Sequence, residues 1–396
     1  MRIILNMTGL TLPRITRGVV LLVLVTVLVP RRVWPMERAE LVMGTVARVA
    51  IDDPGAAPGA FDEAFAALRA VDATMSLYRA ESDLVRVNAH AAAHPEPVGT
   101  ELFALLVRAR ELSIETDGAF DITVLPLLRL WGAYPELAYL GPGSRGAVGF
   151  AGLRLDSQAR TVNFHRQGMG LDLGGIAKGF ALDRARAVLA AAGVRCARLD
   201  LGGNLAFLGG GPGGEWDVAV RDPDAPEKPL GVLSLEADST LSTSANYARD
   251  FVAEGWRVSS HVYDPRSGRP VLRPLAVTAW AADATTADAL STALLVLGPE
   301  GSPAVLEREP QAGALFVEGR GPTRRVTIQG RLPRAWLEGA AAIRDRAEGP
   351  ATARVAVEDA PDSRVLGGGQ CDRPCMTERY RDVRRCQNRT AAKRKD

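Results

Sequence analysis

The pentapeptide Leu-Asp-Leu-Gly-Gly occurs twice in this chain, at residues 171–175 and 199–203. Each copy joins a short apolar run to two glycines, which predicts a strand that ends in a tight turn. After the first copy, Lys178 opens an alanine-rich segment that predicts a helix to about Ala192, where a glycine follows. Two strands separated by one helix would place both glycine turns at the same edge of a sheet.

The first glycine turn has the features of an anion-binding site. Its backbone can approach a ligand closely, the amides at the start of the next helix attract negative charge, and Lys178 adds a positive charge. The spacing is neither GxxxxGK[ST] nor GxGxxG. Such a turn serves close packing as often as phosphate binding, so both interpretations stay open.

A second polar cluster lies in residues 287–293, within a segment that predicts a helix ending at a Gly-Pro pair. Asp288, Ser291 and Thr292 are three and four residues apart, so their oxygens can share one helical face. Oxygen ligands of this kind suit Mg²⁺. A single carboxylate is weak evidence for a metal site, however. The alternative is a solvent-facing helix start capped by Asp283 or Asp288.

The segment 260–270 contains the best candidate for a general base. Residues 264–268 have the composition of a turn, and His261 lies at its edge. The chain has only four histidines, and His90 and His94 are expected in an exposed, alanine-rich loop. Because histidine titrates near neutral pH, His261 suits proton abstraction, although bonding to the turn backbone is an alternative role.

Helical and strand patterns alternate irregularly along the chain. Helical spacing occurs at residues 61–68 and 100–118, and strand patterns occur at Thr45–Ile51 and Leu275–Ala281. The absence of a regular strand-helix-strand rhythm favours an α+β fold over a doubly wound sheet. Hydrophobic residues make up 47% of the 396, which is enough for one large core or two closely packed ones. Cys196 stands alone in an apolar stretch and is expected to be a buried structural thiol.

The two ends of the chain differ from its centre. Arginines precede the apolar run 19–29, which is the order of a signal peptide or N-terminal membrane anchor, although a cleavage site is missing and a start codon placed too early is the alternative. We therefore expect residues 1–35 to direct export, to the periplasm or the outer face of the inner membrane. Residues 36–345 are expected to form one domain, and residues 346–396 a basic, disordered tail.

Charge is concentrated at the end of that tail. Residues 371–396 contain nine Lys or Arg and four Asp or Glu, a net charge of +5, against a formal net charge of +2 for the whole chain. The rest of the chain therefore carries −3, and no nucleic-acid surface is expected. Three cysteines lie in this tail without a fourth ligand at regular spacing, which disfavours zinc.

Eight motifs in order resemble the FAD:protein FMN transferase (ApbE) family. They are MGT at 43–45, MSLY at 75–78 with Ser82 and Asn88, GAFDITVLPLLRLWG at 118–132, DLGGIAKG at 172–179, DLGGN at 200–204, STSANY at 242–247, HVYDPRSG at 261–268 and ADALSTA at 287–293. The ordered set is far more specific than any one motif.

The resemblance implies a single α+β domain, related to tunnelling folds, that binds its substrate FAD in a cleft with Mg²⁺ at the pyrophosphate. The residues that would contact FAD are Met43, Tyr78, Ala119, Phe120, Asp121, Asp172, Lys178 and, through its backbone, Val262. The metal ligands would be the carbonyl of Gly175 together with Asp288, Ser291 and Thr292. His261 would lie beside the reacting phosphate.

The implied reaction splits FAD, releases AMP and joins FMN through a phosphoester to a Thr or Ser hydroxyl of an acceptor protein. With water in place of the acceptor, the protein would act as an FAD pyrophosphatase. A protein that binds or carries FAD without transferring FMN is a further alternative. Such a protein keeps the FAD pocket but does not need His261 to act.

The sequence departs from the family pattern in two places. The N-terminal apolar run has no nearby cysteine, so the lipid anchor common in the family is not expected here. Ala245 stands where the family usually has glycine in STSGxY. An alanine is tolerated there unless the backbone needs a positive φ.

Overall fold

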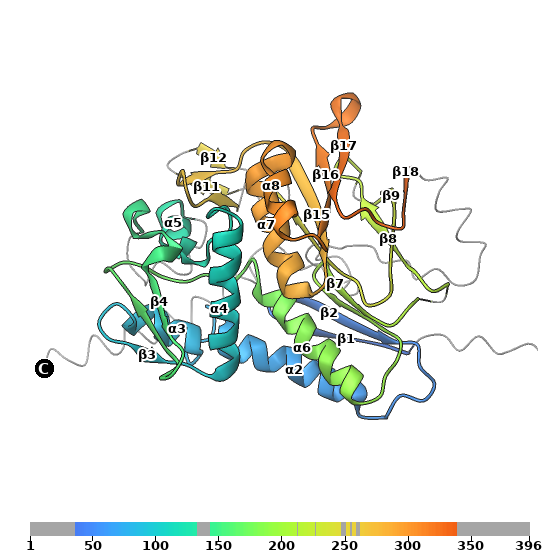
Figure 1. Ribbon diagram of the computed structural model, residues 1–396, viewed down its shortest axis with the longest axis horizontal. Coiled ribbons are helices and arrows are strands. Elements are labelled where there is room, and N and C mark those ends of the chain that lie inside the picture. The colour runs from blue at the N-terminus through green and yellow to red at the C-terminus, as the bar shows by residue number, and fades with distance from the viewer. Residues whose placement is uncertain are drawn as a thin grey trace, which may run out of the picture. The chain divides into compact units, whose positions relative to one another are not determined.

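The computed structural model describes residues 36–132, 143–211, 213–225, 227–246, 251–253, 256–258 and 262–338 (Figure 1). The predicted export segment, the basic tail and His261 lie outside these residues. Within the described ranges, none of the helices combines the length and the apolar character needed to span a bilayer.

An eight-stranded sheet in the order β1-β2-β6-β7-β10-β15-β16-β17 forms the centre of the fold. All of its neighbouring strands are antiparallel. The strands are β1 (Met36–Val42), β2 (Thr45–Ile51), β6 (Ala197–Leu201), β7 (Asn204–Leu208), β10 (Thr240–Ala245), β15 (Leu275–Ala281), β16 (Gly313–Glu318) and β17 (Arg325–Gly330). The bounds predicted for β2 and β15 are confirmed.

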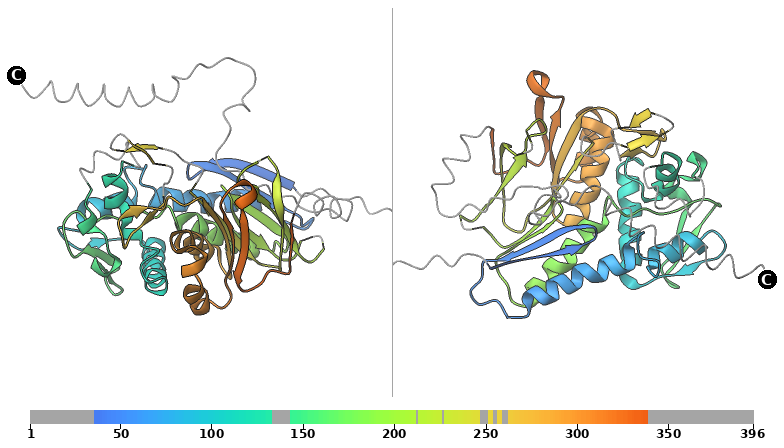
Figure 2. Two further views of the ribbon diagram at one scale, coloured as in Figure 1. Left: turned by 90° about the horizontal axis from the view of Figure 1, so that it is seen from above. Right: turned by 180° about the vertical axis from the view of Figure 1, so that it is seen from behind.

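Three helices pack on one face of this sheet, and Figures 1 and 2 show them side by side. They are α2 (Ala60–Met75), α6 (Ala177–Ala191) and α7 (Ala284–Gly301). Helix α6 lies between the other two and contacts both. The predicted end of α7 is confirmed as a break, because Gly298 has non-helical φ and ψ angles of 69° and 177° just before Pro299.

A smaller sheet covers the opposite face. It has the order β18-β9-β8 and consists of β8 (Trp216–Arg221), β9 (Pro229–Leu235) and β18 (Ala335–Glu338). Successive residues of the central strands face opposite sides, so Ala206 and Phe316 join the core under the helices while Phe207 and Leu315 join the core between the two sheets. Helices and an antiparallel sheet in separate layers make an α+β fold, as the sequence predicted.

The remaining described α-helices and strands are short, except for helix α4 (Thr100–Glu115), which packs against α7. The short ones are α3 (Asp83–His90), α5 (Leu125–Leu130), α8 (Pro303–Arg308), β3 (Glu96–Pro97), β4 (Leu153–Asp156), β5 (Thr161–Phe164), β11 (Phe251–Ala253), β12 (Trp256–Val258), β13 (Tyr263–Asp264) and β14 (Arg269–Pro270). His90 is exposed as expected, but it ends helix α3 rather than lying in a loop.

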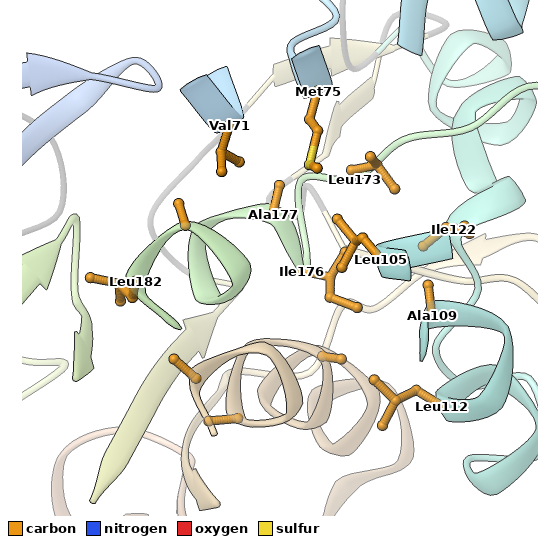
Figure 3. Packing of buried hydrophobic residues seen from close by; sticks show 14 of the residues in the cluster. Val71, Met75, Leu105, Ala109, Leu112, Ile122, Leu173, Ile176, Ala177 and Leu182 are labelled. Carbon is orange, nitrogen blue, oxygen red and sulfur yellow. The ribbon is translucent and has the colours of Figure 1, made fainter. Parts of the chain in front are cut away.

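The start of helix α6 is anchored in the main hydrophobic core. Ile176 is directed toward Leu105 and Ala109 of α4, and Met75 of α2 lies near Ala177 (Figure 3). All five side chains are at most 4% exposed. The residues that follow the first glycine pair are therefore held from two sides by helices distant in sequence.

The first Leu-Asp-Leu-Gly-Gly copy is not a strand, which corrects the sequence prediction. Residues 171–173 are irregular and lead through a turn at residues 174–176 into α6, whereas the second copy ends β6 and turns into β7. The side chain of Asn88 explains the difference. Its amide nitrogen donates to the carbonyl of Leu171 at 3.0 Å, and its amide oxygen accepts from the Leu171 N–H at 2.6 Å. These bonds replace those that a neighbouring strand would supply.

Cys196 is only partly buried, in contrast to the buried thiol expected from the sequence. It lies just before β6, and its Sγ donates to the carbonyl of Gly210 at 3.3 Å. Its partial burial raises the pKa of the thiol, which disfavours the reactive thiolate.

Replacing Asn88 by alanine should lower the free energy of unfolding by about 1–3 kcal/mol, because both Leu171 backbone groups lose their partner. Chemical denaturation measures the change. Asn163→Ala is the matched control, since Asn163 makes one bond to a backbone carbonyl, at 2.8 Å, and should cost less. Equal losses in the two variants would contradict the role given to Asn88.

Candidate active site

The start of α6 lies directly against α7, with Gly179 at the contact. A Cβ atom at Gly179 would lie 2.1 Å from the carbonyl oxygen of Ala284 and 2.8 Å from the Cβ of Asp288. No side chain fits at such distances. The Gly179 N–H also donates to Oδ2 of Asp288 at 2.9 Å, so the close approach is fixed by a hydrogen bond to a carboxylate.

Asp288 and Lys178 face each other across this contact. The Asp288 residue is 2% exposed, and its Oδ1 lies 3.9 Å from Nζ of Lys178. The same Nζ donates to the carbonyl of Gly174 at 3.0 Å. The buried carboxylate therefore has two sources of positive potential, the lysine and the amide in the first turn of α6.

Thr292 lies beside the glycine turn itself. A Cβ at Gly175 would be 3.0 Å from Oγ1 of Thr292 and 3.5 Å from the ring of Phe120. Gly175 thus has just enough space between a hydroxyl of α7 and an aromatic ring. The structure brings together the glycine turn, the lysine and two oxygens of the second polar cluster, which the sequence placed far apart.

Ser291 lies next to Asp288 on the side of α7 that meets the sheet. Its hydroxyl is fully buried and lies 2.7 Å from Oγ of Ser244 and 3.1 Å from Oγ of Ser242, both on β10. It also donates to the backbone carbonyl of Asp288 at 2.9 Å. Successive helical residues point about 100° apart around the axis, so Thr292 faces the turn while Ser291 faces the sheet.

The loop after α4 forms a wall next to the turn. Ala119, Phe120 and Asp121 are all buried, and the loop is tied to the turn by the Asp172 N–H, which donates to the carbonyl of Ile122 at 2.8 Å. Asp121 accepts bonds from the N–H and hydroxyl of Thr123 at 2.8 and 2.7 Å. A third bond comes from the N–H of residue 150 at 2.8 Å. Burial raises the pKa of Asp121 and these bonds oppose the rise.

Asp172 lies inside the glycine turn. Its Oδ1 accepts from the Gly174 N–H at 2.7 Å, which closes the turn. Burial raises the pKa of Asp172, while that bond and the positive charge of Lys178 lower it. The carboxyl group of Asp172 in the turn and the ammonium of Lys178 in the first turn of α6 are therefore separated by only five residues of chain.

The other predicted FAD contacts lie at the ends of separate elements. Met43 is half-buried in the turn between β1 and β2, with a φ of 52° followed by 73° at Gly44, as a two-residue hairpin turn requires. Tyr78 follows α2 and is 61% exposed. Val262 is buried just before β13, and its carbonyl accepts from the N–H of Val271 at 2.9 Å. His261 lies outside the described residues.

The donor atoms around Asp288 suit a hard cation. Among the described residues, no three His, Cys, Asp or Glu side chains are grouped so that they could hold a metal ion. A cation here would therefore rest on one carboxylate and neutral oxygens, without nitrogen or sulfur ligands. Such a donor set fits Mg²⁺, which keeps several waters and takes the remaining oxygens from a substrate.

Four further residues support the site, although the sequence assigned no role to them. Ser242 and Ser244 on β10 face α7, and Asn204 at the start of β7 is within 2.8 Å of Ser242 Oγ. Asp183 accepts bonds from the backbone N–H groups of Ala284 and Thr285 at 2.9 and 2.8 Å, which fixes the start of α7. The alternation in STSAN was an available signal, because residues two apart share a strand face.

Ala245 adopts the ordinary backbone of a strand. It is part of β10, pairs with Ala276 and has no positive φ. The methyl group that replaces the glycine of the related motif is therefore accommodated without backbone strain.

The arrangement has known counterparts. Residues 43–316 match the model of the ApbE family. The FAD:protein FMN transferase of Treponema pallidum (strain Nichols) is 35% identical over 311 residues, which cover 72% of this chain and 85% of that protein. That of Escherichia coli (strain K12) is 32% identical over 253 residues, which cover 61% and 72%.

Solved structures agree with this similarity. The ApbE protein of Thermotoga maritima superposes with a TM-score of 0.65 at 29% identity, covering 74% of this chain and 96% of that one. The apo form of the Pseudomonas stutzeri flavinyl transferase ApbE gives a TM-score of 0.63 at 32% identity, covering 74% and 94%.

Substitution of Gly179 by alanine should force α6 and α7 apart and lower the free energy of unfolding by about 1–3 kcal/mol. The matched control is Gly213→Ala, because a Cβ at exposed Gly213 meets no atom within 4 Å. Thermal and chemical denaturation of both variants tests this. A Gly179 variant as stable as the control would show that the helices do not meet as closely as described.

Proposed function

The chain belongs to the ApbE family, and from this membership we propose that it transfers the FMN half of FAD to another protein. In the proposed reaction, Mg²⁺ assists cleavage of FAD, FMN becomes joined through a phosphoester to a Thr or Ser hydroxyl of the acceptor, and AMP is released. One observation carries the proposal. The glycine turn with Lys178 meets Asp288 and Thr292 of α7 at a single point.

The turn would hold the pyrophosphate of FAD. The start of α6 and the ammonium of Lys178 both lie against Asp288, since the Gly179 N–H donates to Oδ2 at 2.9 Å and Nζ of Lys178 lies 3.9 Å from Oδ1. A helix start combined with a lysine attracts a dianion. Because both groups are fixed in place before substrate arrives, they can stabilise charge that develops on the phosphates as AMP leaves.

Asp288, Thr292 and the carbonyl of Gly175 would hold Mg²⁺. The ion would supply charge neutralisation at the pyrophosphate oxygens. Ser291 was expected among the ligands, but its hydroxyl lies against β10, so we assign it a supporting position behind Asp288. The ammonium of Lys178, 3.9 Å from Oδ1 of Asp288, compensates the negative charge of this carboxylate.

The flavin and adenosine would lie against residues whose side chains are exposed. Tyr78 is 61% exposed and Met43 is half-buried, so these two have area for contact with an aromatic ring. Ala119, Phe120 and Asp121 are at most 6% exposed and would instead form the wall of the cleft. Asp172 and the backbone of Val262 would complete the contacts with FAD.

His261 would take the proton from the acceptor hydroxyl. The hydroxyl oxygen bonds to the phosphorus of the FMN half, the bond from that phosphorus to the bridging oxygen breaks, and AMP leaves with the electron pair. With water as nucleophile the products are free FMN and AMP. The next residue after His261, Val262, is buried, and its carbonyl accepts from the N–H of Val271 at 2.9 Å.

We also propose that the protein acts outside the cytoplasm. The basic and apolar order of residues 1–35 supports export. The acceptor would then be a periplasmic protein or the exported part of a membrane protein.

Asp288→Ala should abolish AMP release and acceptor flavinylation, and it should remove the rise in melting temperature that Mg²⁺ gives. The reason is the loss of the single carboxylate at the proposed metal position. Asp183→Asn is the control, since it alters a half-buried carboxylate of the same helix pair that bonds to the start of α7 and to Arg186 and not to the proposed metal position. Full activity of the Asp288 variant at ordinary Mg²⁺ concentration would contradict the assignment of Asp288 as a Mg²⁺ ligand.

His261→Ala should slow flavinylation strongly, by about 10²–10⁴-fold for a general base, while leaving FAD binding nearly unchanged. Mass spectrometry of the acceptor and fluorescence titration with FAD measure the two effects. If the His261 variant and the unsubstituted protein flavinylate the acceptor at the same rate, proton abstraction belongs to another group. A purified wild-type protein that binds FAD but releases no AMP would favour a flavin carrier.

A further inference from the structure

Ser242 on β10 lies behind the carboxylate of Asp288 and contacts three oxygens. Its Oγ is 2.8 Å from Oδ1 of Asn204, 3.1 Å from Oγ of Ser291 and 3.2 Å from Oδ1 of Asp288. All four residues are at most 2% exposed. A hydroxyl has one proton to donate, so the direction of each bond is constrained.

The directions conflict when the amide oxygen of Asn204 faces Ser242. The Ser242 proton then goes to Asn204 over the shortest distance, and Asp288 Oδ1 meets a hydroxyl lone pair. The amide nitrogen of Asn204 is buried with no hydrogen-bond partner. A buried donor left in this way costs about 1–3 kcal/mol.

Rotation of the Asn204 amide by 180° removes the conflict. The oxygen and nitrogen of an asparagine are assigned from the bonds around them, so the rotated amide is the same side chain in its other orientation. Its N–H donates to Ser242 at the same 2.8 Å, and the Ser242 proton is free for Asp288 Oδ1 at 3.2 Å. The unpartnered position is then occupied by an acceptor, which native proteins leave unpaired more readily than a donor.

A second set of bonds converges on the same residue. Ser291 donates to the backbone carbonyl of Asp288 at 2.9 Å, and its Oγ lies 2.7 Å from that of Ser244. Because the one proton of Ser291 goes to that carbonyl, Ser244 is the donor in the second bond. Both sets start from the central sheet and end on one residue of α7. Donors from the sheet side leave the carboxylate directed toward Gly179 and Lys178.

We propose that Asn204 and Ser242 are positioning residues for metal binding. Together they form a hydrogen-bond chain, from the Asn204 N–H through the Ser242 hydroxyl to Asp288, that fixes the carboxylate for a divalent cation. This inference rests on the proposed function, since it needs Asp288 to be a ligand. Groups that orient a metal ligand from behind typically change metal affinity by about 10–100-fold when removed.

The strand itself offers a matched control. Thr243 lies between the two serines on β10 but faces the other side of the sheet, where its hydroxyl is 2.9 Å from that of Thr278. Thr243→Val therefore removes a hydroxyl from the same strand without touching the chain to Asp288.

The test is Mn²⁺ binding to the full-length protein, followed by electron paramagnetic resonance. We expect Ser242→Ala and Asn204→Ala each to weaken Mn²⁺ binding about tenfold. The double variant should bind Mn²⁺ at least as tightly as the single variant with the lower affinity, because either change breaks the same hydrogen-bond chain. Thr243→Val should bind as the unsubstituted protein does. In assays of AMP release, the Mg²⁺ concentration for half-maximal rate should rise more than kcat falls.

Folded Ser242→Ala protein with unchanged Mn²⁺ affinity would overturn the inference, as would additive losses in the double variant. If Asn204→Ala does not fold, Ser242→Ala against Thr243→Val decides the question alone. A failure of the proposed function would give a different experimental result. In that case the unsubstituted protein itself binds no Mn²⁺, and the inference falls with it.

Discussion

The bond between the Gly179 amide and the Asp288 carboxylate joins the two halves of the site. It needs a residue without a side chain on α6, since a Cβ would overlap Ala284. It also needs a buried carboxylate on α7 whose negative charge is compensated. Lys178 and the start of α6 provide this compensation. Every other group described around the site is placed relative to this contact, because it sets the distance and rotation of the two helices.

The sequence predicted the α+β class and the strands β2 and β15, because their apolar patterns are long and regular. It also predicted that Lys178 and Asp288 belong to one site, but only through the resemblance of ordered motifs. Residues more than a hundred positions apart meet through helix packing, which no local pattern records. Taken singly, the glycine turn and the polar helix face each had an ordinary structural explanation.

Two features that the sequence pattern did not predict, the irregular backbone at residues 171–173 and the side of α7 on which Ser291 lies, have physical causes. Residues 171–173 have the apolar pattern of a strand, yet Asn88 satisfies the Leu171 backbone in place of a neighbouring strand. Ser291 has helical spacing from Asp288, but spacing alone does not say which side of a buried helix meets the sheet. In both cases a side chain from a distant segment decides the outcome, so a window of sequence cannot.

Strand β10 shows how one strand serves both stability and chemistry. Leu241 and Ala245 enter the core between the sheets, whereas Ser242 and Ser244 face α7 and reach the residue proposed to bind a cation. The alternation of a strand makes this division possible at single-residue spacing. A shift of β10 by one residue would place an apolar side chain behind Asp288 and hydroxyls in the core. The register of β10 with β15 is therefore a requirement of the site as well as of the fold.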